Sequence, residues 1–471
     1  NTSLIATDWY IDQMKKRTYN SSPIPSQLEH KQYAYGVRDY VKHEALIDSV
    51  RWDIKDFMNW VGSDHPRTKY KNLLQQYGAE MSNVPKFTQN MVFYPTNKIR
   101  IPVNKKNVIE SGLVNLKDAS LIVDYIDIDL PSSGLYKNQL LMLDILANND
   151  WKRPIYFTGG SYNDSEYLWM KDYLQLDGLV YKLVPIKTEI PKNNPYELGR
   201  IDSELMYRIV KGWEWGNSNG SNIYHDPETR KNSISFRGNL HRLALKLLED
   251  GENDKAEEIL DLSLKKIPIQ YFGFYSLLEP YISTYYKLEK FKKGDQLFES
   301  LAKKYIQNLN YYSELSKSKG SRFSIYTYAE NIITDSERYR SLVESVLNSN
   351  NIDIKGKAIE DYVKSTSFVK ELYGDYEYYT LLTPFLEHLY KSKNHNLPKN
   401  LYLNISKEFR NRLVLFEEMQ PENKTNYIEN IANNLFQYTK ILNILKENEN
   451  DESFIKSEIE TFLALKESLT N

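Results

Sequence analysis

The stretch that decides the fold of this chain is HRLALKLLEDGENDKAEEILDLSLKKIP (241–268). Two apolar stripes at helical spacing lie on either side of Gly251, a residue type that commonly ends helices. Pro268 follows the second stripe and cannot continue a helix. The pattern predicts two antiparallel helices joined by a short turn. The stripes consist of Leu240, Leu243, Ala244, Leu247 and Leu248 before the turn, and of Ala256, Ile259, Leu260, Leu264 and Ile267 after it.

The first of these helices has a clear start. HDPETRKN (225–232) places Asp226 at a helix cap, Pro227 at the first helical position and Glu228 in the first turn. These are the residue types that satisfy or tolerate the unpaired amides of a helix N-terminus. The sequence therefore predicts a helix that begins at Asp226 or Pro227.

A second copy of the helix pair follows in YISTYYKLEKFKKGDQLFESLAKKY (281–305). Gly294 takes the place of Ala256, at an offset of 38 residues. Two helices with small residues at their crossing and a proline at the exit resemble a tetratricopeptide unit, whose usual period is about 34 residues. We therefore expect a degenerate helical repeat, continued by amphipathic helices through residues 306–471.

The N-terminal part mixes strand and helix patterns. We expect strand ends at 1–6 and a helix that starts at Thr7 or Asp8. Strand, helix and strand over 121–160 favour a parallel pair with a helical crossover. The other predicted elements are helices over 46–61 and 136–150, strands over 98–103, 121–130 and 153–160 (buried), and a turn followed by a strand over 173–186.

These patterns define the expected fold class. We predict an α+β or α/β domain over residues 1–200, after which IPKNNPYELG (190–199) reads as a linker. Tetratricopeptide-like helical repeats follow over 201–310, and a further helical region over 311–471. The chain is expected to be mainly helical overall.

Composition excludes several classes of protein. The 471 residues carry a formal net charge of −2, so no nucleic-acid partner or anionic membrane surface is implied. Cysteine is absent, which removes disulfides and thiolate metal sites. The apolar stretch LLMLDILA (140–147) is far shorter than the roughly 20 residues of a membrane-spanning helix.

Few residue patterns suggest catalysis. Asp127 and Asp129 share one strand face, with Asp124 on the other, as in either a carboxylate pair or an ordinary exposed strand. Gly159-Gly160 ends a predicted strand, where a ligand loop or a simple turn is possible. No HExxH, GxSxG or other tight metal-ligand spacing occurs among the seven histidines, so we expect no metal site.

Trp213 and Trp215 lie in GWEWGNSNGSNIY (212–224) at the junction between the two regions. Indole rings beside a polar, glycine-rich loop can stack on sugar rings. They can equally seal an interface between domains, and both interpretations stay open.

Four stretches together resemble the soluble C-terminal region of protein O-mannosyltransferase-like polytopic membrane proteins, and the resemblance continues to about residue 300. The stretches are TDWYIDQMKKR (7–17), GVRDYV (36–41), KNQLLMLDILANNDWKRPIYF (137–157) and YLQLDGLVYKLVP (173–185). The N-terminal half of such proteins is a membrane domain similar to glycosyltransferases that use lipid-linked sugars. In those glycosyltransferases the catalytic carboxylate lies in the membrane domain. The resemblance implies a periplasmic or extracytoplasmic location at a Gram-negative inner membrane and a piece cut from a longer protein.

The resemblance, together with the tryptophans described above, gives a set of candidate residues that face a ligand or partner. In the structural interpretation, Asp8 is a helix cap, Trp9 is a core residue and Asp39 pairs with an arginine. In the functional interpretation, Arg38, Asp39, Tyr173 and Gln175 face the membrane half and shape an acceptor or lipid-linked sugar site, in which Arg38 pairs with a phosphate. The candidates are Asp8, Trp9, Arg38, Asp39, Arg153, Tyr173, Gln175, Trp213 and Trp215, with no catalytic residue in this chain.

Three functions remain open. The first is an accessory part of a membrane glycosyltransferase-like protein, not catalytic alone, that contacts its own upstream membrane domain and acceptor or envelope proteins. A lipid-linked sugar donor is then implied by the resemblance alone, and no other cofactor is expected. The second is an interaction scaffold without a glycosyltransferase role, and the third is a stand-alone carbohydrate-active enzyme that uses Asp127 and Asp129.

Overall fold

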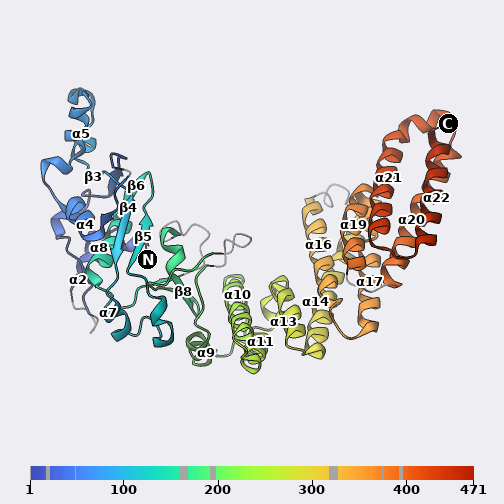
Figure 1. Cartoon of the computed structure of the whole chain (residues 1–471), viewed down its shortest axis with the longest axis horizontal. Helices are drawn as coiled ribbons and strands as arrows, with labels where there is room; N and C mark the ends of the chain where they lie inside the picture. The colour runs from blue at the N-terminus through green and yellow to red at the C-terminus, as the bar shows by residue number, and fades with distance from the viewer. Residues whose placement is uncertain are drawn as a thin grey trace. The chain divides into compact units, whose positions relative to one another are not determined.

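The structure, a computed structural model, describes residues 2–16, 22–47, 49–158, 168–190, 198–317, 327–373, 375–391 and 396–470. The chain divides into two compact units, Asn1–Glu214 (unit 1) and Trp215–Asn471 (unit 2) (Figure 1). As predicted, a small α/β region comes first, a helical region follows, and helix predominates overall. Among the described helices, none combines the length and the apolarity that crossing a membrane requires.

Unit 1 contains short helices and nine short strands among its described residues. Its α-helices are α1 (Thr2–Ile5), α2 (Asp8–Lys15), α3 (His30–Tyr33), α4 (Ile54–Gly62), α5 (Tyr70–Gln76), α6 (Lys86–Asn90), α7 (Lys105–Glu110), α8 (Lys137–Asn149) and α9 (Ser203–Lys211). Its 3-10 helices are η1 (Pro66–Thr68), η2 (Met81–Asn83), η3 (Leu116–Leu121) and η4 (Leu168–Tyr173). Its strands are β1 (Tyr40–His43), β2 (Trp52–Asp53), β3 (Phe93–Tyr94), β4 (Lys98–Pro102), β5 (Tyr125–Asp129), β6 (Gly134–Tyr136), β7 (Tyr156–Thr158), β8 (Leu174–Asp177) and β9 (Val180–Leu183).

The described strands form three small sheets, ordered β3-β1-β6, β2-β4-β5 and β7-β9-β8. β1 runs parallel to β3 and β2 parallel to β4, whereas the other pairs are antiparallel. One core gathers the apolar faces of these elements, including Phe57 of α4, Leu140 and Leu143 of α8, and Ile126 and Ile128 of β5. Burying such side chains contributes about 1.5–3 kcal/mol each, so this core carries the stability of unit 1.

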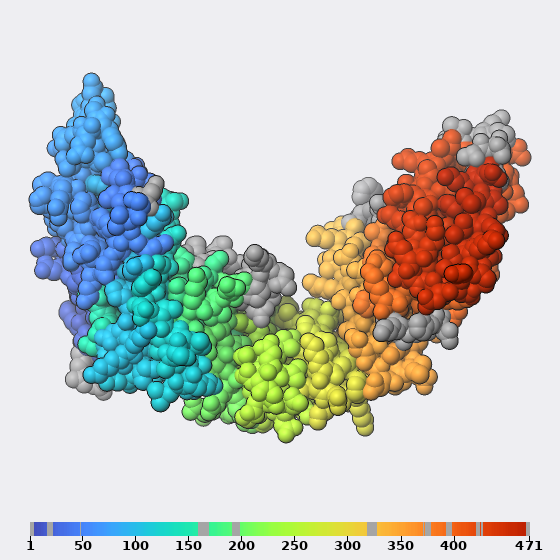
Figure 2. Space-filling model, in the orientation of Figure 1, coloured from blue at the N-terminus to red at the C-terminus, as the bar shows by residue number. Residues whose placement is uncertain are grey.

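A projecting lobe of unit 1 holds a small core of its own. Tyr70 and Leu73 of α5 pack with Phe93 of β3 there. Figure 2 shows this lobe as the narrow blue end of unit 1. The lobe exposes Tyr77 (64%) and Phe87 (73%).

Four predictions for unit 1 are wrong. The predicted strand end at 1–6 is helix α1, which packs against α8. The helix over 46–61 begins only at Ile54, because Asp53 caps it by accepting a hydrogen bond from the Lys55 amide (2.8 Å). The parallel pair over 121–160 does not form, because β5 pairs with β4 and β7 pairs antiparallel with β9. β7 is also largely exposed, in contrast to the buried strand predicted over 153–160.

Two other predictions concern the stretch 173–186 and the loops at 159–160 and 190–199. The stretch 173–186 contains the strand β8 before its turn as well as β9 after it. Gly159-Gly160 and most of the linker 190–199 lie outside the described residues.

Unit 2 is an array of helices. In chain order these are α10 (Pro227–Glu249), α11 (Asn253–Lys266), α12 (Ile269–Phe272), η5 (Tyr275–Leu278), α13 (Glu279–Lys287), α14 (Phe291–Lys317), α16 (Ala329–Val346), α17 (Ile352–Thr366), α18 (Phe368–Tyr373), α19 (Asp375–Lys391), α20 (Asn396–Glu417), α21 (Pro421–Asn448) and α22 (Glu452–Thr470). α10 packs on α11, α13 on α14, α16 on α17, α19 on α20 and α21 on α22. In Figure 2 the colours of unit 2 follow one another in chain order from green to red, as expected for pairs stacked one after another.

The first two helix pairs share the same turn at the offset of 38 residues. The Glu252 amide donates to the Leu247 carbonyl (2.8 Å), and the Lys290 amide donates to the Tyr285 carbonyl (2.8 Å). The turn residue has a positive φ in both pairs, 80° at Gly251 and 59° at Glu289. The second copy predicted at 281–305 is therefore a helix pair with the same connection.

Aromatic rings join successive pairs. Tyr339 of α16 stacks on Tyr305 of α14, with ring centroids 5.8 Å apart and planes 13° apart. The same ring meets Tyr362 of α17 edge-on, at 5.6 Å and 73°. Offset stacks and edge-to-face pairs are the favoured aromatic geometries, so the three rings fix α14, α16 and α17 together.

The same arrangement recurs at the last helices. Tyr438 of α21 stacks on Phe409 of α20 at 5.4 Å and 9°, and meets Phe462 of α22 edge-on at 5.1 Å and 87°. The aromatic joint is thus a repeating feature of unit 2.

Candidate functional site

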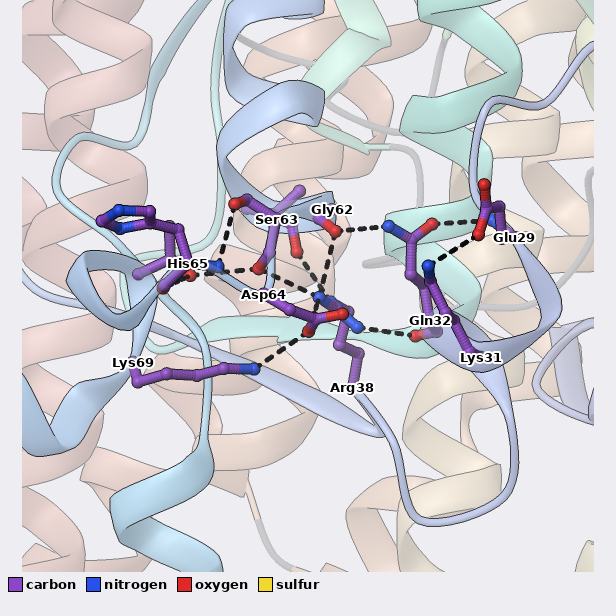
Figure 3. A network of polar contacts seen from close by, with 11 residues as sticks. Glu29, Lys31, Gln32, Arg38, Gly62, Ser63, Asp64, His65 and Lys69 are labelled. Atoms are coloured by element: carbon purple, nitrogen blue, oxygen red, sulfur yellow. Dashed lines mark hydrogen bonds and ion pairs between the residues drawn. The ribbon is translucent and has the colours of Figure 1, made fainter.

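Arg38 is the best-anchored candidate residue. Its guanidinium lies at the C-terminal end of α4, where the last carbonyls of a helix lack partners within the helix. Nε donates to the Val61 carbonyl (2.7 Å), and Nη2 donates to the Gly62 carbonyl (3.1 Å). Figure 3 shows the guanidinium surrounded by Gly62, Ser63, Asp64 and Gln32.

These contacts give Arg38 a structural task. Its side chain is only 2% exposed, and it forms an ion pair with Asp64 at 2.8 Å. Its backbone has a φ of 51°, a conformation that few residues other than glycine adopt. The fork that would have held a phosphate is occupied by the protein's own carbonyls, so Arg38 caps α4.

Asp8 and Trp9 lie at the start of α2. Thr7, and not Asp8, occupies the cap position. The carboxylate of Asp8 accepts hydrogen bonds from the Trp9 amide (2.7 Å) and from the Tyr35 amide (3.1 Å). Trp9 is 65% exposed, so the expectation of a core residue is wrong. Asp8 therefore ties the exposed Trp9 to the turn that carries Tyr35.

Asp39 pairs with a lysine where an arginine was expected. Lys137, the first residue of α8, contacts the Asp39 carboxylate through Nζ at 2.5 Å. The same Nζ donates to the Ala34 carbonyl (3.0 Å). The Asp39 side chain stays 58% exposed, whereas that of Lys137 is 5% exposed, so Asp39 can still contact a partner.

Three exposed aromatic residues, Trp9, Tyr35 and Tyr136, are chain neighbours of the residues that make these contacts. The Tyr35 side chain (91% exposed) projects from the turn closed by the Val37 amide and the Ala34 carbonyl (2.9 Å). Tyr136 (62% exposed) lies next to Lys137 in the chain, and its ring meets that of Tyr40 at 5.3 Å. We call Trp9, Tyr35, Tyr40 and Tyr136 the aromatic surface.

Sequence reasoning missed Tyr35, Tyr136 and Lys137. The dipeptide Tyr35-Gly36 is the signal that could have found the first, because Gly36 has a φ of 75°, as the third residue of a type II turn requires. Such a turn pushes the preceding side chain into solvent. The placement of Tyr136 beside Tyr40 comes from the pairing of β1 with β6, which no local pattern predicts.

Tyr173 and Gln175 belong to a different part of unit 1: Tyr173 ends η4, and Gln175 lies in β8 of the β8–β9 hairpin that follows it. Tyr173 is 7% exposed, and burial raises the pKa of its hydroxyl. Gln175 donates through Nε2 to Asp177 (2.9 Å), which forms a buried ion pair with Lys182 (3.0 Å). The structure therefore separates Tyr173 and Gln175 from Arg38 and holds both in buried contacts.

The two tryptophans divide between the units. Trp213 packs on the β8–β9 turn, where a Cβ added at Gly178 would lie 2.8 Å from Cζ2 of the indole. Trp215 lies in unit 2, with its ring 5.5 Å from that of Phe236. Each indole thus has an aromatic or backbone contact within its own unit.

Arg153 lies apart from the other candidates. Its side chain is exposed and donates through Nη1 to the Pro23 carbonyl (2.7 Å). Its own carbonyl accepts a hydrogen bond from the Asn149 side chain at the end of α8 (2.7 Å). Arg153 therefore helps to hold the segment around Pro23 against unit 1.

The strand carboxylates are neutralised by arginines. Asp127 accepts two hydrogen bonds from Arg100, at 2.8 and 2.9 Å, and Asp129 pairs with Arg51 at 2.8 Å. The Arg100 hydrogen bonds hold the pKa of Asp127 below its usual value. Asp124 pairs with Lys105 at 2.8 Å. No cluster of three or more histidine or carboxylate side chains that could hold a metal ion occurs in the described part of the chain.

One comparison with known proteins gives a match. The family model described as TMEM260-associated domain 2 matches residues 1–205. The matched residues lie within unit 1 and include Asp8, Trp9, Arg38 and Asp39. No curated protein and no solved structure matches the chain. Residues 1–205 are therefore similar to a domain associated with TMEM260.

Proposed function

We propose that this chain is an extracytoplasmic part of a membrane-embedded glycosyltransferase-like protein, and that it recognises acceptor or partner proteins. The match of residues 1–205 to a TMEM260-associated domain carries this proposal, since TMEM260 is an O-mannosyltransferase-like membrane protein. The resemblance of the TDWYIDQMKKR and KNQLLMLDILANNDWKRPIYF stretches points the same way. On this proposal the sugar-transfer chemistry belongs to a membrane-embedded part and not to these residues.

The aromatic surface supports a docking role for unit 1. Trp9, Tyr35 and Tyr136 are each more than half exposed. Tryptophan and tyrosine are enriched at protein interfaces and dominate their binding energy. Asp8 and Lys137 hold the backbone beneath these rings in place. We infer that the aromatic surface contacts the membrane-embedded part of the parent protein.

Unit 2 supports the recognition of partners. Its stacked helix pairs and recurrent turn agree with a tetratricopeptide-like repeat. Such arrays present extended surfaces to partner proteins. Unit 2 is therefore the part that we expect to recruit acceptor or envelope proteins.

An interaction scaffold without a glycosyltransferase role is the second candidate. The same helix pairs favour this candidate, because a helical array can bind partner proteins without any catalytic activity. The stand-alone enzyme is not proposed, since Arg100 and Arg51 already engage Asp127 and Asp129.

The test introduces Trp9→Ala and Tyr35→Ala together into the full parent protein. The matched control is Tyr77→Ala with Phe87→Ala, which removes two rings of the projecting lobe that are also each more than half exposed. We expect the first pair to lower glycosylation of envelope proteins at least severalfold and the control pair to leave it unchanged. Docking by the aromatic surface would be contradicted if both double variants glycosylated envelope proteins equally well. The comparison requires that both variants are present in the membrane in equal amounts.

A second measurement separates the two candidate functions. Glycosylation of envelope proteins is compared between cells that have and cells that lack the full parent protein. Identical glycosylation, together with envelope proteins that co-purify with the parent, would favour the scaffold.

A further inference from the structure

The outer face of the β4–β5 ladder carries the two strand carboxylates that the sequence singled out. Alternate residues along β5 are buried in the core of unit 1. Tyr125, Asp127 and Asp129 therefore lie together on the opposite face of the strand. In the register of the ladder, Arg100 of β4 faces Asp127. This outer face thus presents one aromatic ring and two carboxylates in a row, with an arginine beside them.

Two arginines hold these side chains in fixed positions. Arg100 donates from Nε and Nη2 to the two carboxylate oxygens of Asp127, at 2.8 and 2.9 Å. The guanidinium carbon of Arg100 also lies 3.6 Å from the centre of the Tyr125 ring. Arg51, which precedes β2, contacts Asp127 at 3.5 Å and donates to Asp129 at 2.8 Å. The five side chains form one connected set, which we call the arginine–aspartate face.

The arginine–aspartate face keeps hydrogen-bonding groups in solvent. Asp127 engages Nε and Nη2 of Arg100 but not Nη1, and the Arg100 side chain is 41% exposed. The Asp129 side chain is 61% exposed, and Tyr125 is 44% exposed. Donors, acceptors and an aromatic ring are therefore accessible to a ligand at the same place.

The stability of the sheet does not account for the second arginine. Exposed ion pairs contribute little to folding, and Arg100 already neutralises Asp127 across the ladder. Arg51 comes from outside the ladder and also donates to the Ile128 carbonyl (2.8 Å). These side chains hold one another in place before any ligand arrives, which lowers the entropic cost of binding one.

We propose that the arginine–aspartate face binds a neutral saccharide. Each sugar hydroxyl both donates and accepts hydrogen bonds, so two neighbouring hydroxyls match a guanidinium and the carboxylate paired with it. The C–H groups on one side of a sugar ring are apolar and pack against an aromatic ring such as Tyr125. The two arginines and two aspartates carry no net charge, so they offer an anion no excess positive charge. This binding site goes beyond the proposed function and does not depend on it.

The test titrates the full chain with the methyl glycosides of glucose, mannose and galactose and follows the sugar protons by saturation-transfer difference NMR. We expect at least one glycoside to bind with a Kd in the millimolar range, as small ligands on open surfaces do. Arg100→Ala should weaken binding about tenfold, because it removes charge-assisted hydrogen bonds, and Tyr125→Ala should weaken it severalfold. Lys105→Ala is the matched control. It removes an exposed ion pair with Asp124 outside the arginine–aspartate face and should leave binding unchanged.

A second variant covers the case in which Arg100→Ala does not fold. Arg100→Lys keeps the positive charge but cannot form two parallel bonds to Asp127, so it should also bind the sugar severalfold more weakly than the wild-type chain. The proposal is wrong if none of the three glycosides binds, or if Arg100→Lys and Tyr125→Ala bind as well as the wild-type chain. It is also wrong if millimolar inorganic phosphate displaces the sugar completely at constant ionic strength, since the face would then be an anion site. Each of these failures leaves the glycosylation measurements on the parent protein unaffected.

Discussion

Replacing Gly294 by alanine tests whether the crossing of α13 and α14 needs a residue without a side chain. Gly294 is buried near the start of α14. An added Cβ would lie 2.4 Å from Cε1 and 2.8 Å from Cδ1 of Tyr286. Non-bonded carbons prefer a separation of roughly 3.5–4.0 Å, so the tyrosine ring must move by about 1 Å.

Tyr286 has little freedom to move. It is 7% exposed, and its hydroxyl donates to Asp295 at 2.8 Å. Its ring also stacks on Phe291 at 5.8 Å. Overpacking of this kind costs about 1–3 kcal/mol, and a lost hydrogen bond to a charged group costs about 1.5–3 kcal/mol. Alanine regains about 1 kcal/mol in helix propensity, so we expect Gly294→Ala to destabilise the pair by about 1.5–5 kcal/mol.

Two other helical glycines provide matched controls. Gly238 in α10 and Gly356 in α17 have no atom within 4 Å of an added Cβ. Alanine at either position should stabilise its helix by about 1 kcal/mol. The same substitution is thus expected to have opposite signs at different glycines.

Hydrogen exchange of α13 and α14 amides in the full chain is the appropriate assay, because the two units can unfold separately. A double-mutant cycle with Tyr286→Leu identifies the cause, since removal of the ring should remove most of the cost. Two results would refute the reasoning. One is protection of the α13 and α14 amides in Gly294→Ala that equals their protection in Gly238→Ala. The other is a loss of stability in Gly294→Ala that stays the same when Tyr286→Leu is added.

Three further predictions concern single residues. Arg38→Lys should destabilise unit 1 by about 2–4 kcal/mol, because a lysine cannot bond the Val61 and Gly62 carbonyls together; urea unfolding measures this, and inorganic phosphate should not rescue it. Glu289→Gly should stabilise the α13–α14 turn by about 1 kcal/mol, because a non-glycine residue there holds a φ of 59°, and slower amide exchange in that turn is the check. Burial lowers the pKa of His241 from 6.5 to about 4, so its stabilising effect is present above pH 6.5 and is lost as the pH falls toward 4. His241→Gln should flatten the unfolding free energy across that window, and an unchanged pH slope would contradict the assignment.

Local patterns in the sequence determined most of unit 2. Gly251, Pro227 and the apolar stripes depend on contacts within a few residues, and helix starts and turns follow from such local chemistry. The offset between Ala256 and Gly294 likewise located the second pair. The strands at 98–102 and 125–129 and the helix at 137–149 were predictable for the same reason.

Tertiary structure alone decided which segments meet. The pairing of β7 with β9 instead of β5 depends on the competition between distant partners, which a local pattern does not encode. Trp9 is exposed and Arg38 buried because of where α2 and α4 pack, although their residue types suggest the reverse. The contacts of Asp8 with the Tyr35 amide, and of Lys137 with Asp39 and the Ala34 carbonyl, join separate elements, and only the folded chain places these groups within reach of one another.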